Sequence, residues 1–395
     1  MRLARLPIAA FLIGLAAQTG AAGAQTCGGD FAAWLSAVVE EAKAEGVGEA
    51  GQKAIASAQF NPDVIKRDRA QGIFTRTFLD FSSRLISQNR LDVGRAKLNA
   101  HTSDFARAEA TYGVPGAVIA AFWGLETDFG GYLGDFDTIN SLATLAHDCR
   151  RPELFRPQLI AAGRLVDVGD LPRSEMKGAW AGEIGQTQFL PEDYLRYGID
   201  DDGDGKVDLR HSEKDVIQST ANFLKGIGWR AGEPWLEEVR VPDELPWAEA
   251  DLYIRHPRSQ WAEWGVTSVD GSPVPADAVP VSLILPMGRK GPAFLGYENF
   301  DIYLKWNQSS VYTLTAAYFA TRLAGAPKVS PGRGAPEFSA DQLKDLQRRL
   351  QARGYDVGEV DGVIGASTRA AIKAEQIRLG LPADSYPSAD LFAGL

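Results

Sequence analysis

A single glutamate, Glu126, interrupts an otherwise apolar stretch of the chain. The stretch runs from Val114 to Gly130 and reads VPGAVIAAFWGLETDFG. Its apolar residues recur at three- and four-residue spacing, which predicts a helix with one apolar face. Glu126 lies four residues after Phe122 and three before Phe129, so its carboxyl group is expected on that face. Lost hydration there would raise its pKa, as a general acid near neutral pH requires. A structural helix glutamate in an ion pair is the alternative.

A glycine-rich stretch offers a second set of polar side chains. It spans residues 178–191 and reads GAWAGEIGQTQFLP. Its three glycines allow close backbone approach, and Gln186 and Gln188 present amide donors and acceptors that suit sugar hydroxyl and N-acetyl groups. A glycine-rich turn with solvated polar residues would give the same pattern.

An aspartate-rich stretch, DDDGDGKVD at residues 200–208, has the spacing of a calcium-binding loop. Position six is Gly205, and position twelve is His211, where a bidentate glutamate would be expected; Asp215 could close the loop instead. An acidic turn without a cation is disfavoured because its carboxylates repel one another. We therefore expect a structural Ca²⁺, with these ligands: Asp200, Asp202, Asp204, the carbonyl of Lys206, Asp208 and Asp215.

Composition excludes several functions. The 395 residues can hold two or three domains, and 45% hydrophobic with 23% charged residues is typical of globular proteins. The net charge of −10 argues against nucleic acid or an anionic membrane as partner. The sequence has no glycine-rich phosphate loop, HExxH zinc pattern or GxSxG elbow, and its four histidines lack ligand spacing. We expect no catalytic cofactor and no stable membrane anchor.

The first residues have the pattern of a secretory signal peptide, expected over residues 1–24. Arg2 and Arg5 precede an apolar run at 6–17, and small residues at 22–24 offer a cleavage site. The run is too short to span a membrane. Cleavage would remove two arginines and change the net charge from −10 to −12.

The chain has two cysteines, Cys27 and Cys149. In an exported chain such a pair predicts a disulfide. A lipid-modified Cys27 is the weaker alternative, because residues 24–26 lack the usual leucine and small-residue run before the cysteine.

Helices must position most of these side chains. Periodicity predicts them at residues 31–45, 63–91, 93–112, 114–130, 140–146, 157–168 and 300–323. Residues 232–286 change character and predict a small strand-containing insertion, with β-prone runs at 237–241, 252–255 and 279–285. Four tryptophans in the insertion fit a core better than sugar platforms: Trp235, Trp247, Trp261 and Trp264.

A Pro/Gly-rich segment, 326–337, is expected to link a first domain, 25–325, to a small C-terminal domain, 338–395. Ser339 and Gln342 form a capping box at the start of this domain. Gly354 should stop that helix, and a second should follow Ser367.

Several motifs, in this order, resemble those of lytic murein transglycosylases of the B type: YGVP with WGLETDFGG, LATLAHDCRRPELF, GAWAGEIGQTQFLP, the aspartate loop and NFDIYLKWNQSSVY. The match covers about residues 30–325. The tail, with DGVIGASTRAAI as its most telling part, is similar to the three-helix peptidoglycan-binding module. The resemblance implies a mainly α (α+β) protein: a lysozyme-like catalytic domain with a small strand-containing insertion, followed by the three-helix module.

The family's activity would fall on Glu126, which matches the family's only catalytic carboxyl group. The resemblance implies cleavage of the β-1,4 bond between N-acetylmuramic acid and N-acetylglucosamine without water. Glu126 would protonate the leaving oxygen and then accept the proton of the muramoyl C6 hydroxyl, giving a 1,6-anhydro end. The implied partners are peptidoglycan glycan strands and stem peptides; we expect a monomer in the periplasm.

The resemblance carries substrate-binding roles to six further residues: Gln188, Arg150, Arg151, Trp306, Asn307 and Tyr312. Gln186 is expected to bind substrate beside Gln188 because of the amides of the glycine-rich stretch. The second glutamine of the pair would contact the sugar near the scissile bond. The arginine pair could contact carboxylates of the glycan or peptide. A hydrogen-bonding role in the core is the alternative for each residue.

Two residues depart from the family pattern. Ala179 stands where serine is frequent, and Glu183 stands where alanine is frequent. A second glutamate could raise the pKa of Glu126, bind a substrate amine or position a water. Glu183 and Asp128 leave open a hydrolytic muramidase on the same scaffold. Ala179 and Glu183 leave open a degenerate cleft in a peptidoglycan-binding protein.

Overall fold

The computed structural model describes residues 27–70, 76–307 and 309–395, and the expected signal segment 1–24 lies outside them. Helices make up most of the described chain, and two small antiparallel sheets complete it. This confirms the predicted mainly α (α+β) class. None of the described helices is both long and apolar enough to cross a membrane.

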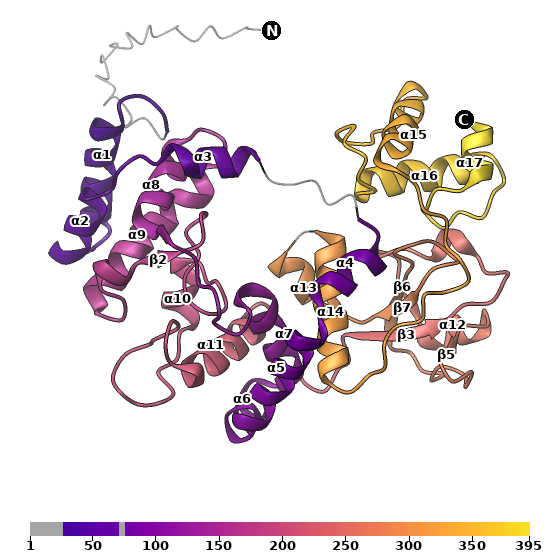
Figure 1. Ribbon diagram of the computed structural model, residues 1–395, viewed down its shortest axis with the longest axis horizontal. Coiled ribbons are helices and arrows are strands. Elements are labelled where there is room, and N and C mark those ends of the chain that lie inside the picture. Colours follow the sequence, from indigo (N-terminus) through magenta and orange to yellow (C-terminus); the bar gives the residue numbers. More distant parts are fainter. Residues whose placement is uncertain (1–26, 71–75, 308) are drawn as a thin grey trace, which may run out of the picture.

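A helical body occupies the chain before the larger sheet. Its helices are α1 (Phe31–Ala44), α2 (Glu49–Ala56), α3 (Pro62–Arg69), α4 (Phe78–Leu85), α5 (Gln88–Ala100), α6 (Thr102–Tyr112), α7 (Gly116–Thr127), α8 (Thr138–His147), α9 (Pro152–Val168), α10 (Pro191–Tyr197) and α11 (Glu213–Gly226). Helix α7 packs against α5, α6 and α11, near the middle of the molecule (Figure 1). Because neighbours surround it, α7 is buried on nearly all sides, and the predicted single apolar face understates its burial.

Capping residues divide two of the predicted helices. The helix expected over 63–91 is wrong as one element, because Thr77 and Ser87 cap new helices there. Their hydroxyl groups accept hydrogen bonds from the amides three residues on. The helix expected over 93–112 is interrupted at His101. Helix α9 begins five residues earlier than predicted because Pro152 suits its first turn.

The helix expected over 300–323 is also two helices, α13 (Phe300–Trp306) and α14 (Ser310–Leu323). Between them Asn307 has extended backbone, with φ −143° and ψ 125°. Its side-chain oxygen accepts a hydrogen bond from the Ser309 amide at 2.9 Å. This local bond competes with the helical pattern, so the helix stops.

The larger sheet has the strand order β4-β6-β7-β3-β5, with neighbours antiparallel. Its strands are β3 (Leu236–Arg240), β4 (His256–Pro257), β5 (Thr267–Ser268), β6 (Pro280–Ile284) and β7 (Ala293–Gly296), with helix α12 (Arg258–Glu263) beside them. The smaller sheet pairs β1 (Phe136–Asp137) with β2 (Lys177–Gly178). Two short 3₁₀ helices span Arg173–Glu175 and Trp247–Glu249.

The strand predictions are partly confirmed. The run at 237–241 overlaps β3, and the run at 279–285 contains β6. The run at 252–255 is wrong, because the chain bends there and pairs only at β4. Strand β7 was not predicted: all four of its residues are buried, so it lacks the alternation that marks a strand.

The insertion's tryptophans serve as core, as predicted. Trp261 is fully buried and Trp247 is 6% exposed, both in a separate apolar cluster around the sheet. Trp264 packs against that cluster, and Trp235 packs against the main core and donates a hydrogen bond to the Ala317 carbonyl at 3.0 Å.

The C-terminal unit contains α15 (Ala340–Ala352), α16 (Ala366–Arg378) and α17 (Ala389–Gly394) around its own apolar cluster. The predicted capping box of Ser339 and Gln342 is present. The unit lies against the sheet region (Figure 1), where Arg369 donates to the Pro286 carbonyl at 2.6 Å and Lys373 pairs with Asp251 at 2.9 Å. It is thus docked on the rest of the protein.

The expected linker, 326–337, is packed along this arrangement. Val329 is buried, and its amide donates to the Tyr318 hydroxyl at 2.9 Å. The Ser330 amide donates to Glu238 at 2.8 Å. The segment therefore runs along the sheet region as ordered structure, which its Pro/Gly composition did not predict. The domain boundaries themselves stay a prediction.

The two cysteines form the predicted disulfide, Cys27–Cys149, which joins positions 122 residues apart. The Gly28 amide also donates to the His147 carbonyl at 2.8 Å. These bonds attach the first described residues to the end of α8, on the chain that leads to α9.

Candidate active site

Glu126 lies at the C-terminal end of α7, just before the chain turns. The helix ends at Thr127, and Asp128 and Phe129 follow with φ of 52° and 59°. The Phe129 ring folds back onto the helix, where a Cβ on Gly124 would lie only 2.5 Å from it. This close packing fixes the last turn of the helix, and with it the direction of the Glu126 side chain.

Two aromatic side chains from α13 and α14 hold one oxygen of Glu126. Trp306 Nε1 donates to Oε1 at 3.0 Å, and Tyr312 Oη donates to the same Oε1 at 2.8 Å. Both donors were predicted as substrate-binding residues and lie 180 and 186 residues later in the chain. The described residues form no hydrogen bond with Oε2, which leaves this oxygen for a substrate.

Burial raises the pKa of Glu126 to about 7. The hydrogen bonds from Tyr312 and Trp306 oppose this rise, because they favour the carboxylate, and the nearby carboxyl group of Glu183 adds to it. Burial and the charge of Glu126 raise the pKa of Tyr312, so its hydroxyl stays a donor. Glu126 can therefore carry a proton near neutral pH, as the sequence predicted.

A cavity of about 400 Å³ opens beside Glu126. It has the size of a ligand site and a mixed apolar and polar lining. The lining residues come from α7, the glycine-rich stretch, α10, α11 and α13: Glu126, Ala179, Trp180, Glu183, Gln188, Phe189, Leu190, Asp193, Phe223, Lys305, Trp306 and Asn307. The structure thus brings together four predicted site residues in one cavity, with Tyr312 bonded to Glu126 behind it.

The glycine-rich stretch forms a tight turn that presents Gln188 to the cavity. Ile184 and Phe189 exchange backbone hydrogen bonds of 2.8 and 2.9 Å across the turn. Gln188 itself has φ 54°, and its side-chain nitrogen Nε2 donates to the Gly185 carbonyl at 2.8 Å. The side chain is thereby held in the orientation in which it lines the cavity.

Gln186 has a different place from the one predicted. It is 5% exposed and does not line the cavity. Its Oε1 accepts from Trp123 Nε1 at 2.8 Å, its Nε2 donates to the Arg210 carbonyl at 3.0 Å, and its own carbonyl accepts from the Thr127 hydroxyl at 2.5 Å. The predicted substrate contact is therefore wrong: Gln186 fastens the end of α7 to the glycine-rich turn.

Arg150 and Arg151 also point elsewhere. Both bind the carboxylate of Asp68, which is 2% exposed, with Arg150 at 2.6 Å. Although burial opposes it, their hydrogen bonds lower the pKa of Asp68. Neither arginine lines the cavity. The carboxylate they were predicted to contact is supplied by the protein itself, and the pair joins α3 to the chain after the disulfide.

Sequence reasoning missed some residues of the cavity, above all Asp193 and Lys305. Burial raises the pKa of Asp193 to about 6, and the charge of Glu192 adds to the rise. Lys305 directly precedes Trp306, and Asp193 lies at the start of α10, two residues beyond the glycine-rich stretch. Their nearness to the two motifs was the only available signal.

Three carboxylates of the aspartate loop converge. Asp200, Asp202 and Asp204 each offer one oxygen, and these oxygens lie within 4.8 Å of one another. Gly203 and Gly205 have φ of 77° and 90° and donate their amides to Asp200, which shapes the turn. Three hard oxygen donors on such a loop fit Ca²⁺.

The other expected ligands have other partners. Asp208 accepts hydrogen bonds from the amides of Arg210 and His211 at 2.9 Å. Asp215 is buried, and its two oxygens accept from the amides of Asp201 and Asp208 at 2.9 and 2.8 Å. Asp215 thus holds the two ends of the loop, and its role as a Ca²⁺ ligand stays a prediction. The backbone amide of Lys206 donates a hydrogen bond to Asp204 Oδ1 at 2.9 Å.

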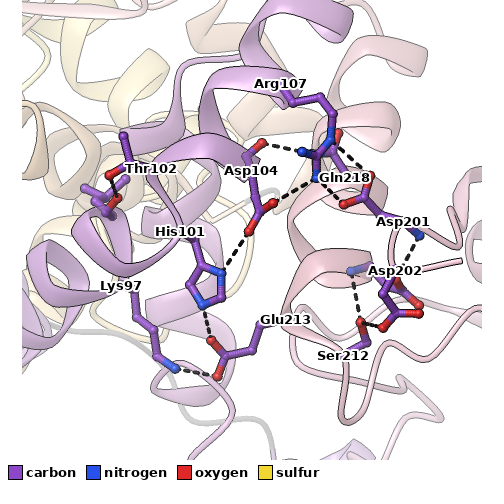
Figure 2. Close-up of polar contacts among 12 residues, drawn as sticks. Lys97, His101, Thr102, Asp104, Arg107, Asp201, Asp202, Ser212, Glu213 and Gln218 are labelled. Atoms are coloured by element: carbon purple, nitrogen blue, oxygen red, sulfur yellow. Dashed lines mark hydrogen bonds and ion pairs between the residues drawn. The ribbon is translucent and has the colours of Figure 1, made fainter. Parts of the chain in front are cut away.

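Ion pairs connect this loop to helices beside α7 (Figure 2). Arg107 pairs with both Asp201 and Asp104, and His101 lies between Asp104 and Glu213, 3.1 and 2.6 Å away. The chain of contacts continues through Glu213 to Lys97, whose ammonium lies 5.1 Å from the centre of the Trp123 ring in α7. These contacts connect the chain around the aspartate loop to one side of the helix that carries Glu126.

Comparison with known proteins agrees with this architecture. The transglycosylase SLT domain family matches residues 30–321, and a peptidoglycan binding domain family matches residues 339–394. SltB3 from Pseudomonas aeruginosa, solved in complex with NAG-anhNAM-pentapeptide, has a TM-score of 0.84 and 41% identity, covering 93% of this chain and 99% of that chain. Escherichia coli Slt35, solved with calcium, has a TM-score of 0.64 and 25% identity over 77% of this chain and 97% of that chain.

A curated relative, the membrane-bound lytic murein transglycosylase B of Escherichia coli (strain K12), is 29% identical over 239 residues. The aligned part is 60% of this chain and spans 64% of that relative's length. These matches confirm the family resemblance, the lysozyme-like fold and the peptidoglycan-binding tail predicted from the sequence. With a family match over residues 30–321, the chain belongs to the transglycosylase SLT domain family.

Proposed function

We propose that this protein is an exported lytic transglycosylase of peptidoglycan. It cleaves the β-1,4 bond between N-acetylmuramic acid and N-acetylglucosamine and leaves 1,6-anhydromuramoyl ends. The observation that carries the proposal is Glu126: its pKa is raised to about 7, and two neutral donors hold one oxygen beside a cavity. SltB3, whose structure contains an anhydro-sugar pentapeptide, supports the same substrate class.

The geometry supports a two-step proton transfer. Oε2 of Glu126 gives its proton to the glycosidic oxygen, and the bond from that oxygen to C1 of the muramoyl residue breaks. The carboxylate that results is stabilised by Trp306 and Tyr312 on Oε1. It then accepts the proton of the muramoyl C6 hydroxyl while O6 bonds to C1, so no water is consumed.

The other residues of the cavity would bind the substrate or act on Glu126. Gln188, Trp306 and Asn307 line the cavity and would contact sugar rings, while Tyr312 acts through Glu126.

Asp200, Asp202 and Asp204, outside the cavity, would hold a structural Ca²⁺, as the calcium complex of Slt35 supports. The C-terminal domain, 338–395, would bind glycan strands and stem peptides. The disulfide favours an oxidising compartment such as the periplasm; a monomer without a membrane anchor stays our expectation.

Glu126→Gln tests the proposal directly. The amide cannot donate a proton as an acid, so cleavage of purified sacculi should stop while the circular dichroism spectrum stays unchanged. Mass analysis of the fragments from the wild-type protein should find ends one water lighter than reducing ends. Substantial cleavage by the variant would contradict the role of Glu126.

A hydrolytic muramidase is the second candidate, because Glu183 brings another carboxyl group into the same cavity. Such an enzyme would yield reducing muramic acid ends as its main product. The same mass analysis distinguishes the two reactions.

A further inference from the structure

Glu183 lies in a turn whose backbone fixes its position. Its carbonyl oxygen accepts a hydrogen bond from the Ala179 amide at 3.0 Å. A Cβ on Gly178 would lie 1.8 Å from the same oxygen, so glycine is required there. The turn directs the Glu183 side chain to the cavity that Glu126 also lines.

The carboxyl group of Glu183 is incompletely satisfied. The backbone amides of Glu183 and Ala181 lie close to it and act to lower its pKa. Its Oε2, by contrast, is buried and has no hydrogen-bond partner among the residues that the structure describes. A buried oxygen without a partner costs folding free energy, and in native proteins it calls for a partner such as a water or a ligand. Glu183 also lines the cavity, so a ligand seated there can approach its carboxyl group.

The surroundings disfavour a charged Glu183. Burial raises its pKa, and the backbone amides and the charge of Arg151 offset this only in part. Glu126 on α7 and Asp193 on α10 add carboxyl groups to the same cavity. Lys305 on α13 also lines it, but its ammonium donates to a backbone carbonyl at 2.7 Å. A neutral Glu183 would not repel Glu126 when that residue becomes a carboxylate during cleavage.

We propose that Glu183 is a substrate-binding residue that donates a hydrogen bond from its carboxyl group to the acetamido carbonyl oxygen of a sugar seated beside Glu126. The assignment rests on the proposed function. A neutral carboxyl group has one O–H donor, and the amide carbonyl is the strongest neutral acceptor of an N-acetylated sugar. The same group has no charge with which to attract the ammonium of a de-N-acetylated sugar. Glu183 thus makes the cavity selective for N-acetylated strands.

Steady-state kinetics of the full-length protein on soluble glycan strands, with and without their acetyl groups, test this selectivity. Glu183→Ala should raise KM for the acetylated strands about tenfold, the value of one lost hydrogen bond. It should change KM for the de-N-acetylated strands far less, so the preference disappears. Glu183→Gln keeps an N–H donor and the shape of the side chain, and its KM should stay within about threefold of wild type.

The pH dependence separates Glu183 from Glu126. When Glu183 ionises as pH rises, it loses its donor, and KM of the wild type rises. In Glu183→Gln this rise should vanish, whereas kcat should still fall at high pH because Glu126 ionises. Asp193→Asn is the matched control: it removes another carboxyl group from the cavity but leaves the proton of Glu183, so the rise in KM should persist.

Three results would overturn the assignment. One is an unchanged KM and acetyl preference in Glu183→Ala. Another is a Glu183→Gln variant as impaired as Glu183→Ala. The third is an unchanged KM in Glu183→Ala together with fewer reducing ends among the products. That result would show that Glu183 positions a water molecule for hydrolysis. If Glu183→Ala does not fold, Glu183→Gln and its pH profile decide alone.

Failure of the proposed function would look different. If the wild type makes no 1,6-anhydro ends, that function fails whatever Glu183 does. Calorimetric binding of both strand types to Glu126→Gln, with and without Glu183→Ala, then still measures the acetyl preference. Loss of that preference in the double variant supports the assignment, and its retention rejects it.

Discussion

Replacing Glu126 by glutamine should stabilise the folded protein above neutral pH, besides stopping cleavage. The amide keeps the shape of the side chain and the Oε1 acceptor that Trp306 and Tyr312 use. It removes the ionisation that burial makes unfavourable, since burial raises the pKa of Glu126 from 4.5 to about 7. The residue that the reaction needs is therefore one that the folded state tolerates poorly when charged.

The size of this effect follows from the linkage between proton binding and folding. Each pKa unit corresponds to about 1.4 kcal/mol, so the full shift would be worth roughly 3 kcal/mol. Part of the Glu126 side chain faces the open cavity, where water screens its charge, so we expect about 1–3 kcal/mol. Below pH 4.5 both states of the wild type are protonated and the penalty is absent. It grows as pH rises towards 7, because the unfolded chain ionises first, and it is complete above that pH.

Thermal unfolding of the wild type and Glu126→Gln at pH 4, 6 and 8 measures this difference. The variant should match the wild type at pH 4 and melt a few degrees higher at pH 8. Glu175→Gln is the matched control, because Glu175 is exposed and does not line the cavity, and it should give no difference that grows with pH. A Glu126→Gln protein no more stable than the wild type at pH 8 would refute the reasoning, because Glu126 would then carry its charge at no cost.

Two further predictions concern the donors of Glu126 and the cation. Tyr312→Phe removes one hydrogen bond that favours the Glu126 carboxylate. The alkaline limb of the kcat/KM profile should therefore move to higher pH, and kcat should fall about tenfold. An alkaline limb at the wild-type pH would show that the Tyr312 hydroxyl does not act on Glu126. Chelation of calcium should lower the melting temperature, because an ion bound only to the folded state stabilises that state. In Asp202→Asn the chelator should lower the melting temperature less than in the wild type. A melting temperature indifferent to chelator in the wild type would reduce the aspartate loop to a simple turn.

Local patterns predicted the parts of the site whose chemistry is contained in one stretch. The apolar run around Glu126 was sufficient to predict a helix and a carboxyl group with raised pKa. The spacing of the aspartates predicted their convergence, because a loop of that length brings alternate residues together. The capping box at Ser339 is likewise local. In the loop and the capping box the interacting residues lie within a few positions of one another.

Long-range partners could not be predicted in this way. Arg150 and Arg151 were expected to meet a substrate carboxylate, but Asp68, 82 and 83 residues earlier, satisfies them. Gln186 was expected in the cavity, but its side chain accepts a hydrogen bond from Trp123, and its carbonyl accepts one from Thr127 at the end of α7. No pattern around these residues indicates such partners, because folding alone decides which groups meet.

The wrongly predicted helix over 300–323 shows how the fold serves the reaction. On one continuous helix, Trp306 and Tyr312 would be six residues apart and would point about 120° apart around the axis, so they could not reach one oxygen. The break at Asn307 removes this constraint, since its extended backbone separates α13 from α14. The Thr313 hydroxyl then donates to the Asn307 carbonyl at 2.6 Å and fixes the break. A substitution that restored helix at Asn307 would therefore cost Glu126 one of its two donors, even though it left every residue in contact with Glu126 unchanged.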